Sequence, residues 1–122
     1  MSFRSKKIGQ EGENVAAEHL KSKGYEILER NFRCPLGEID IVAKDKEEIV
    51  FVEVKTKSGN LLGTPQEMVN KRKQKKLIKL GQFYLQEKEL NDCPWRIDVV
   101  AIIKDAYGGL DIQVFKNTVE EI

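Results

Sequence analysis

The chain has few of the residues that mark disulfide-rich, zinc-binding or membrane proteins. It contains two cysteines, Cys34 and Cys93, which lie far apart, and a single histidine, His19. No Cys-x-x-Cys motif or Cys/His cluster is present, which argues against a structural zinc site. No apolar run approaches the ~20 residues that cross a bilayer, and no apolar segment follows the basic residues near the start. We therefore expect a cytoplasmic protein with no membrane partner, for which a disulfide has little support.

The charge balance does not indicate a nucleic-acid-binding protein, and no motif for ATP binding is present. The formal net charge is only +1, so composition alone does not indicate a nucleic-acid-binding protein. No Gly-x-x-x-x-Gly-Lys loop is present, so ATP use is not implied, and no motif places a nucleophile beside His19. The length of 122 residues and the 40% of apolar residues suit one domain. We expect a single domain over residues 1–122, with its core at 8–116 and a frayed tail after Asn117.

Apolar periodicity and chain-breaking residues predict a helix, three strands, a second helix and two further strands. Gly24 is a suitable C-cap for the first helix. The predicted elements are a helix over 9–23, strands over 25–33, 38–44 and 49–57, a loop over 58–65, a helix over 66–89, and strands over 96–104 and 110–116. No internal repeat, low-complexity segment or interdomain linker interrupts this order.

Two short acidic segments at a fixed spacing are the main candidates for chemistry. Glu38 and Asp40 lie two residues apart in the first, and Glu53 and Lys55 lie two apart in the second. Side chains two apart on a strand share a face, so a hairpin would bring carboxylates and an ammonium group together. Such a set suits Mg²⁺, which takes one or two carboxylates together with waters and substrate phosphate. A bound divalent ion also lowers the pKa of water.

The pattern D-x(12)-E-V-K across a hairpin resembles the PD-(D/E)XK nuclease superfamily. More narrowly, Gly37–Ala43 and Phe51–Lys57 resemble the YraN-type family of small bacterial endonuclease-like proteins. The resemblance extends over residues 8–116, because further segments match in the same order. These segments are Gly12–Ala16, Arg30–Arg33, Gly63–Pro65, Val69–Gln74 and Arg96–Ala101.

The resemblance implies an α/β protein with a restriction-endonuclease-like α-β-β-β-α-β core, whose mixed central sheet is flanked by helices. It implies that Asp40 and Glu53 bind Mg²⁺ or Mn²⁺ together with the Val54 carbonyl oxygen. Lys55 would position or help to deprotonate the attacking water and stabilise the developing charge. Asp40, Glu53 and Lys55 are therefore the candidate catalytic residues, and Glu38 is given a supporting role.

Glu13 is a further candidate metal ligand, with two interpretations open. On a helix it shares a face with Ala16, Ala17 and Leu20, so it should face the sheet. A buried acid without a partner is costly, and a metal or a lysine would remove that cost. The position also resembles a helical glutamate of Holliday-junction resolvases. The alternative is that Glu13 only lies in the first helical turn and interacts with the helix dipole.

An ordinary salt-bridged surface is the alternative for Asp40, Glu53 and Lys55, with each pair contributing ~0.2–1 kcal/mol. Against it, the apolar residues at 49–52 and Val54 flank Glu53 and indicate a central, buried strand. Unpaired acids are rare at such positions, so the pattern favours a metal site.

A basic run predicts where nucleic acid would bind. From Lys71 to Lys79 six of nine residues are Lys or Arg and none is acidic. On a helix these cations face away from an apolar stripe, and they suit sequence-independent contacts with phosphates. A solvated amphipathic helix is the alternative. The candidate nucleic-acid-binding residues are Lys57, Lys71, Arg72, Lys73, Gln74, Lys75 and Lys76.

The expected activity is metal-dependent hydrolysis of phosphodiester bonds in nucleic acid, with DNA favoured over RNA. Ile39 stands where the superfamily usually has a proline before the aspartate, which fits the narrower family. A small core with no recognition module suits junctions, flaps or ends, as met in repair and recombination, better than a specific sequence. A homodimer would suit a two-fold junction. The alternative is a nucleic-acid-binding or protein-interaction module that keeps the nuclease fold without useful turnover.

Overall fold

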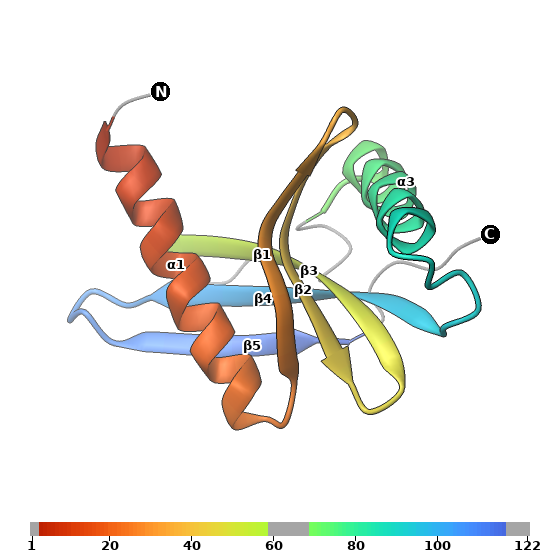
Figure 1. Ribbon diagram of the computed structural model, residues 1–122. Helices are drawn as coiled ribbons and strands as arrows, with labels where there is room; N and C mark the ends of the chain where they lie inside the picture. The colour runs from red at the N-terminus through yellow and green to blue at the C-terminus, as the bar shows by residue number, and fades with distance from the viewer. Residues whose placement is uncertain (1–2, 59–68, 117–122) are drawn as a thin grey trace.

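A five-stranded mixed sheet joins the parts of the chain that the computed structural model describes, residues 3–58 and 69–116 (Figure 1). The strands lie in sequence order across the sheet. Neighbours are antiparallel except β3 and β4, which run parallel. The elements are α1 (Phe3–Ser22), β1 (Glu26–Cys34), β2 (Gly37–Asp45), β3 (Glu48–Ser58), α3 (Lys71–Glu87), β4 (Trp95–Lys104) and β5 (Leu110–Phe115).

The two helices cover opposite faces of the sheet. Ala16 and Leu20 of α1 are buried in one apolar cluster with Val52 of β3. Leu80 of α3 is buried in a second cluster with Phe51, the neighbour of Val52 on the same strand. Successive side chains of a strand point to opposite faces, so each helix seals one side of β3. Figure 1 shows the same arrangement, with α1 and α3 separated by the strands.

Helix α3 approaches β3 closely at a glycine. A Cβ atom on Gly81 would lie 2.7 Å from the ring of Phe51, which is too close for an undistorted contact. The Tyr84 ring meets Phe51 edge to face, with centroids 5.7 Å apart. This packing brings the first turns of α3 next to the second half of β3.

The predicted α/β class and the order of the elements are confirmed, and each strand end lies within one residue of its prediction. Gly24 has φ of 94° and the Tyr25 N–H bonds the Leu20 carbonyl oxygen at 3.0 Å, so Gly24 ends α1 as expected. The start of α1 was misplaced, because the helix already begins at Phe3 rather than at residue 9.

The start of α3 was also misplaced, for a local reason. Asn70 has extended backbone angles and its Oδ1 accepts a hydrogen bond from the Lys73 N–H at 2.8 Å. It is therefore the N-cap, and the helix begins at Lys71. The helix ends at Glu87 rather than at residue 89. Residues 59–65 of the predicted loop, residues 66–68 of the predicted helix and the predicted tail lie outside the described residues.

The structure bears on the expectations about a disulfide and about membrane-spanning segments. Cys34 and Cys93 are both free cysteines and are partly buried. No helix within residues 3–58 and 69–116 has the length and apolar character needed to cross a membrane.

Candidate functional site

The β2–β3 hairpin opens where the predicted site residues lie. Regular pairing between these strands runs from the turn to Ile41 and Val52. One residue further, the Asp40 carboxylate takes the place of a backbone acceptor: its Oδ2 accepts a hydrogen bond from the Val54 N–H at 2.9 Å. A charge-assisted bond of this kind fixes the carboxylate at the point of opening. This contact involves the N–H group of Val54. The role of the Val54 carbonyl oxygen as a metal ligand stays a prediction.

Glu53 is a buried acid on the central strand, as the flanking apolar residues indicated. Its side chain is 7% exposed and lies on the face covered by α3, where Lys73 Nζ approaches its Oε1 at 3.7 Å. Burial, followed by the charge of Asp40, raises the pKa of Glu53 to about 7, and the charges of Lys73 and Lys55 only partly oppose this. Near neutral pH this carboxyl is therefore poised between its two protonation states.

Lys55 shares a strand face with Glu53 and is half-buried. Its positive charge opposes the rise in pKa of both Asp40 and Glu53, so its ammonium group lies within electrostatic range of both carboxyls. The structure thus gathers Asp40, Glu53 and Lys55 at the opened hairpin.

Glu13 reaches the same place from the opposite face of the sheet. A Cβ atom on Gly12 would lie 2.6 Å from Thr56 Oγ1, so the helix backbone touches β3 at this point. The next residue along the helix is Glu13, and carboxylate oxygens of Glu13, Glu38 and Asp40 lie within 4.8 Å of one another. The interpretation of Glu13 as a residue that faces the sheet therefore agrees with the structure.

One oxygen of this cluster has no partner. Glu13 Oε1 is buried and makes no hydrogen bond to the described residues. Burial and then the charge of Asp40 raise the pKa of Glu13, although a side-chain hydrogen bond with Asn31 lowers it. An orphaned buried carboxylate oxygen beside two further carboxylates is an unfavourable arrangement unless a cation neutralises it.

The donor set fits a hard divalent cation. Mg²⁺ and Mn²⁺ prefer carboxylate and carbonyl oxygens, and the cluster supplies three carboxylates at half-buried positions. Glu38, expected only to support the site, is one of the three, and its Oε2 also lies 3.4 Å from Arg33 Nε. Glu53 is outside this group of three, since its carboxylate is paired with Lys73.

The predicted nucleic-acid contacts divide into two sets. Lys73 and Gln74 turn partly inward: Lys73 pairs with Glu53, and Gln74 Nε2 donates to the Val69 carbonyl oxygen at 2.7 Å. The remaining candidates are exposed cations available to a phosphate backbone, namely Lys57, Lys71, Arg72, Lys75 and Lys76.

Asn31 is the site residue that the sequence motif did not reveal. It lies on β1 opposite Asp40, between the pairs formed by Arg30 and Phe32, and has a positive φ of 54°. Asparagine tolerates this left-handed conformation better than most residues, which places its side chain beside Glu13. An asparagine in the middle of a strand pattern was the available signal.

The raised pKa of Glu53 predicts a pH-dependent effect of Glu53→Gln. The unfolded carboxyl ionises near 4.5, but the folded one keeps its proton to about 7. The folded wild type therefore binds more protons in this window and loses stability as the pH rises through it. We expect Glu53→Gln to be more stable than wild type by roughly 1–3 kcal/mol above neutral pH, and this advantage to vanish below pH ~4.5.

Urea unfolding at several pH values, in the presence of a chelator, measures this difference. Glu87→Gln is the matched control, because Glu87 is exposed on α3 and its variant should show no such trend. A constant difference between Glu53→Gln and wild type at all pH values would contradict the assignment of the raised pKa.

Fold and site together define a small α/β protein with carboxylates and a lysine gathered where a hairpin opens in the middle of its sheet. The chain belongs to the UPF0102 family: the model described as "Uncharacterised protein family UPF0102" matches residues 12–102. This establishes the family-level part of the YraN-type resemblance. Membership of the PD-(D/E)XK superfamily stays a prediction.

Relatives of similar length carry the same family name. A UPF0102 protein of Clostridium botulinum (strain 657 / Type Ba4) is 48% identical over 119 residues, covering 96% of this chain and 97% of the relative. A UPF0102 protein of Moorella thermoacetica (strain ATCC 39073 / JCM 9320) is 51% identical over 105 residues, covering 86% and 88%. Among solved structures, Pyrococcus furiosus SfsA in complex with Ca²⁺ is similar with a TM-score of 0.42 and 16% identity. The match covers 96% of this chain and 65% of that chain.

Proposed function

We propose that this protein is a metal-dependent nuclease that hydrolyses phosphodiester bonds in DNA, directed by a junction, flap or end rather than by sequence. Such an activity would serve repair or recombination. The proposal depends mainly on the gathering of Glu13, Glu38 and Asp40 beside Glu53 and Lys55. This arrangement leaves a buried carboxylate oxygen of Glu13 without a hydrogen-bond partner among the described residues.

The chemistry divides between the carboxylates and the lysine. Asp40, Glu13 and Glu38 would hold Mg²⁺ or Mn²⁺, and ionised Glu53 would add a fourth carboxylate. The ion, when bound, supplies Lewis-acid activation of water and of a phosphate oxygen. In hydrolysis the water oxygen bonds to phosphorus and the bond to the leaving sugar oxygen breaks. The proton that the water loses is balanced by the proton that the leaving oxygen gains. Lys55 would orient the water and balance the negative charge that develops on the phosphate oxygens.

The exposed cations of α3 suit a DNA backbone that reaches this site. They contact phosphates without reading bases, which is compatible with recognition of shape. Lys73 is positioned between the two regions, because its ammonium group pairs with Glu53 while Arg72 and Lys75 on the same helix are exposed. A homodimer would present two such sites to a two-fold junction.

Calorimetric titration of Mn²⁺ and Mg²⁺, followed by incubation with branched and linear DNA, tests the proposal. We expect wild type to bind metal and to cleave DNA only with metal, and Glu53→Gln to lose most of both. Glu87→Gln, the same change at an exposed site, should behave as wild type. Cleavage that persists in a chelator, or is unchanged in Glu53→Gln, would contradict the site assignment.

The Lys73–Glu53 ion pair favours a second candidate function, a nucleic-acid-binding module without useful turnover. The charge of Lys73 opposes the rise in the pKa of Glu53, so the lysine offsets part of the cost of burying this carboxyl without a metal ion. On this alternative, the double variant Lys75→Glu/Lys76→Glu should abolish DNA binding while Glu53→Gln has little effect. Absence of metal uptake by wild type that still binds DNA would favour the module over the nuclease.

A further inference from the structure

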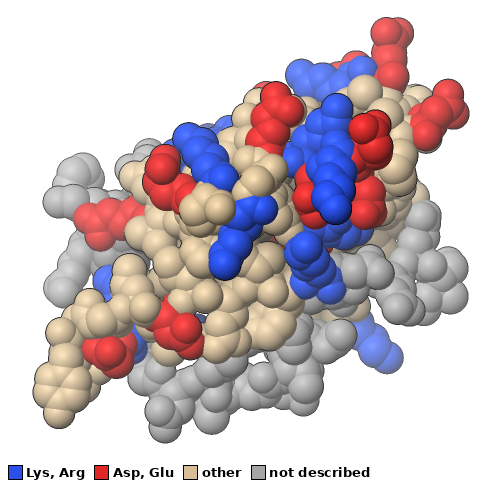
Figure 2. Space-filling model, turned by 90° about the horizontal axis from the view of Figure 1, so that it is seen from below, with Lys and Arg blue, Asp and Glu red and all other residues tan. Residues whose placement is uncertain are grey.

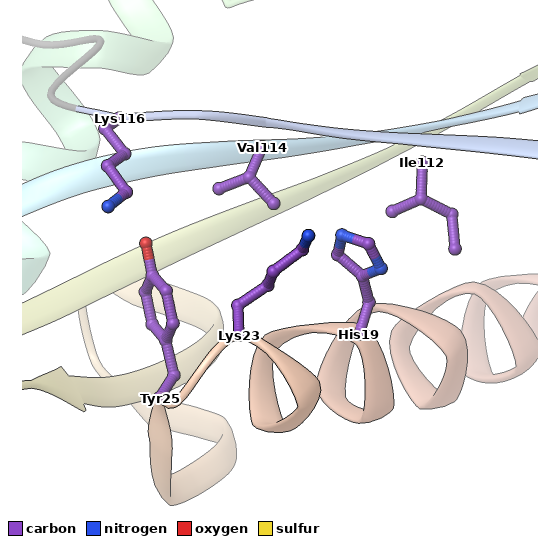
Figure 3. Close-up of a pocket in the computed structure, with 6 residues that line it drawn as sticks. All are labelled: His19, Lys23, Tyr25, Ile112, Val114 and Lys116. Carbon is purple, nitrogen blue, oxygen red and sulfur yellow. The ribbon is translucent and has the colours of Figure 1, made fainter.

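A pocket separate from the carboxylates lies between the end of α1 and strand β5 (Figure 3). Its volume is about 410 Å³, within the range of small-molecule sites. Side chains of both elements, and of residues just beyond them, line it. The described residues that line it are His19, Lys23, Tyr25, Ile112, Val114 and Lys116.

The charged groups that line the pocket are two lysines, and a histidine lies beside them. Figure 3 shows Lys23 and His19 projecting from α1 toward β5, while Lys116 projects from the end of β5 toward the Tyr25 hydroxyl. No acidic side chain is among the described residues that line the pocket. Lys23 has no ion-pair partner within the described part of the chain. These groups together favour an anion.

Two acids close to the pocket, Asp45 and Glu18, also pair with cations that do not line it. Asp45 lies 3.8 Å from Lys116 Nζ, but the same Asp45 oxygen accepts a hydrogen bond from Arg96 at the shorter distance of 2.8 Å. Glu18, which lines the adjoining hollow, pairs with Lys21 at 3.3 Å. Neither carboxylate therefore cancels the charge of the pocket fully, and Lys116, whose ammonium lies 5.9 Å from the centre of the Tyr25 ring, is 62% exposed.

The surrounding face is not a broad basic patch. Figure 2 looks at the end of the molecule where α1 ends and shows basic and acidic side chains interleaved over it. A polyanion would meet charges of both signs there, whereas a small anion could be held by the pocket alone. A small ligand is thus favoured over a long strand of nucleic acid.

The walls of the pocket are apolar and rigid. Ile112 and Val114 are half-buried on β5, and the Tyr25 side chain is only 5% exposed. The Tyr25 hydroxyl donates to Asp98 Oδ2 at 3.1 Å and accepts from Arg96 Nη2 at 3.0 Å. Burial, followed by the charge of Asp98, raises the pKa of Tyr25 to about 12, so the ring adds no negative charge to the pocket. A ligand would find cations beside a preformed apolar surface.

From these observations we propose that the pocket binds a small phosphate monoester of nucleotide size. Its phosphate would lie among Lys23, Lys116 and His19, and its apolar part against Ile112 and Val114. A phosphate monoester carries about −1.5 to −2 charges at neutral pH, which matches the two lysines, and the His19 ring adds a hydrogen-bonding group. Lysines bind phosphate as point charges, so the pocket would favour a ligand with a charged group at one end and an apolar group at the other.

The pocket is independent of the proposed nuclease site. Glu13 and Lys23 lie ten residues apart on or just beyond the same helix, which corresponds to roughly 15 Å at 1.5 Å per residue. Binding should therefore occur in a chelator and in Glu53→Gln, and failure of the nuclease proposal would leave this one intact.

Titration of ¹⁵N-labelled protein with adenosine 5′-monophosphate, adenosine and inorganic phosphate, in a chelator, tests the assignment. We expect saturable shifts near Lys23 and Val114 with the monophosphate, weaker ones with phosphate, and least with adenosine. Lys23→Gln and Lys116→Gln should each weaken binding several-fold, and the double variant more than tenfold. Lys104→Gln, an exposed change at the other end of β4 and β5, should not alter it.

Three results would overturn the assignment. Equal binding of adenosine and the monophosphate would remove the role of the cations. Shifts centred on Lys71–Lys79 would indicate general attraction to the basic helix. Binding of a 5′-phosphorylated oligonucleotide without binding of the monophosphate would mean that the pocket serves nucleic acid rather than a small ligand.

Discussion

Lys55→Gln is expected to lower the rate of DNA cleavage by about a hundredfold to a thousandfold while leaving metal binding nearly intact. The reason is positional. Lys55 shares a face with Glu53 and its charge acts on both Asp40 and Glu53, yet an ammonium group cannot itself be a metal ligand. Its loss should therefore affect the developing charge on phosphate and the orientation of water, rather than uptake of the ion.

The measurement combines single-turnover cleavage with calorimetric titration of Mn²⁺ on the same samples. Lys104→Gln is a matched control, since it removes an exposed lysine from the neighbouring strand. Lys55→Arg should restore charge but not geometry, and is expected to recover only part of the rate. If Lys55→Gln lost metal binding and cleavage in equal measure, Lys55 would act by shaping the cluster and not in the chemical step.

The central hairpin was predictable because a strand that is buried on both faces leaves a distinctive pattern. The continuous apolar residues at 49–52 fixed β3 as an inner strand, and alternation then put Glu53 and Lys55 on one side. The start of α3 was readable in principle, because asparagine followed by a run of helix formers is a common N-cap pattern. The predicted helix nevertheless began at residue 66, before this N-cap.

The contacts among the candidate site residues could not be predicted, because they depend on how distant elements approach. The sequence does not show that Lys73 would pair with Glu53 at 3.7 Å, which requires the packing of α3 against β3 at Gly81. Nor does it show that Glu38 would join Glu13 and Asp40, because that depends on α1 touching β3. Tertiary contacts of this kind have no local periodicity to reveal them.

Arg96 gives the largest expected effect on stability. It is 8% exposed at the start of β4 and bridges several groups that the sequence leaves far apart. Its guanidinium donates from Nε to Asp98 Oδ1 at 3.0 Å and from Nη1 to Glu48 Oε1 at 3.0 Å. Its Nη2 donates to Asp45 Oδ2 at 2.8 Å and to the Tyr25 hydroxyl at 3.0 Å. Arg96 and Asp98 therefore belong to a buried polar network that links β4 to the β2–β3 turn and to Tyr25.

The electrostatics of this network depend on the arginine. Burial lowers the pKa of Arg96, but hydrogen bonds with Asp98 and Asp45 outweigh it and raise the pKa overall. A hydrogen bond from Arg96 is in turn the main reason that the pKa of Asp45 is lowered. Asp98 is fully buried, so loss of the guanidinium would remove the ion pair that offsets the burial of this carboxylate.

Arg96→Met is accordingly expected to lower the free energy of unfolding by about 3–5 kcal/mol, as found when one partner of a buried ion pair is removed. Urea unfolding measures the loss, with an unchanged m value as the sign that the fold persists. Adding Asp98→Asn should recover part of it, because the double variant no longer buries an unpaired charge. If Arg96→Met lowered the free energy of unfolding no more than an exposed substitution such as Lys104→Gln, the network would make no net contribution to stability. The stability of this end of the sheet would then come from its apolar packing alone.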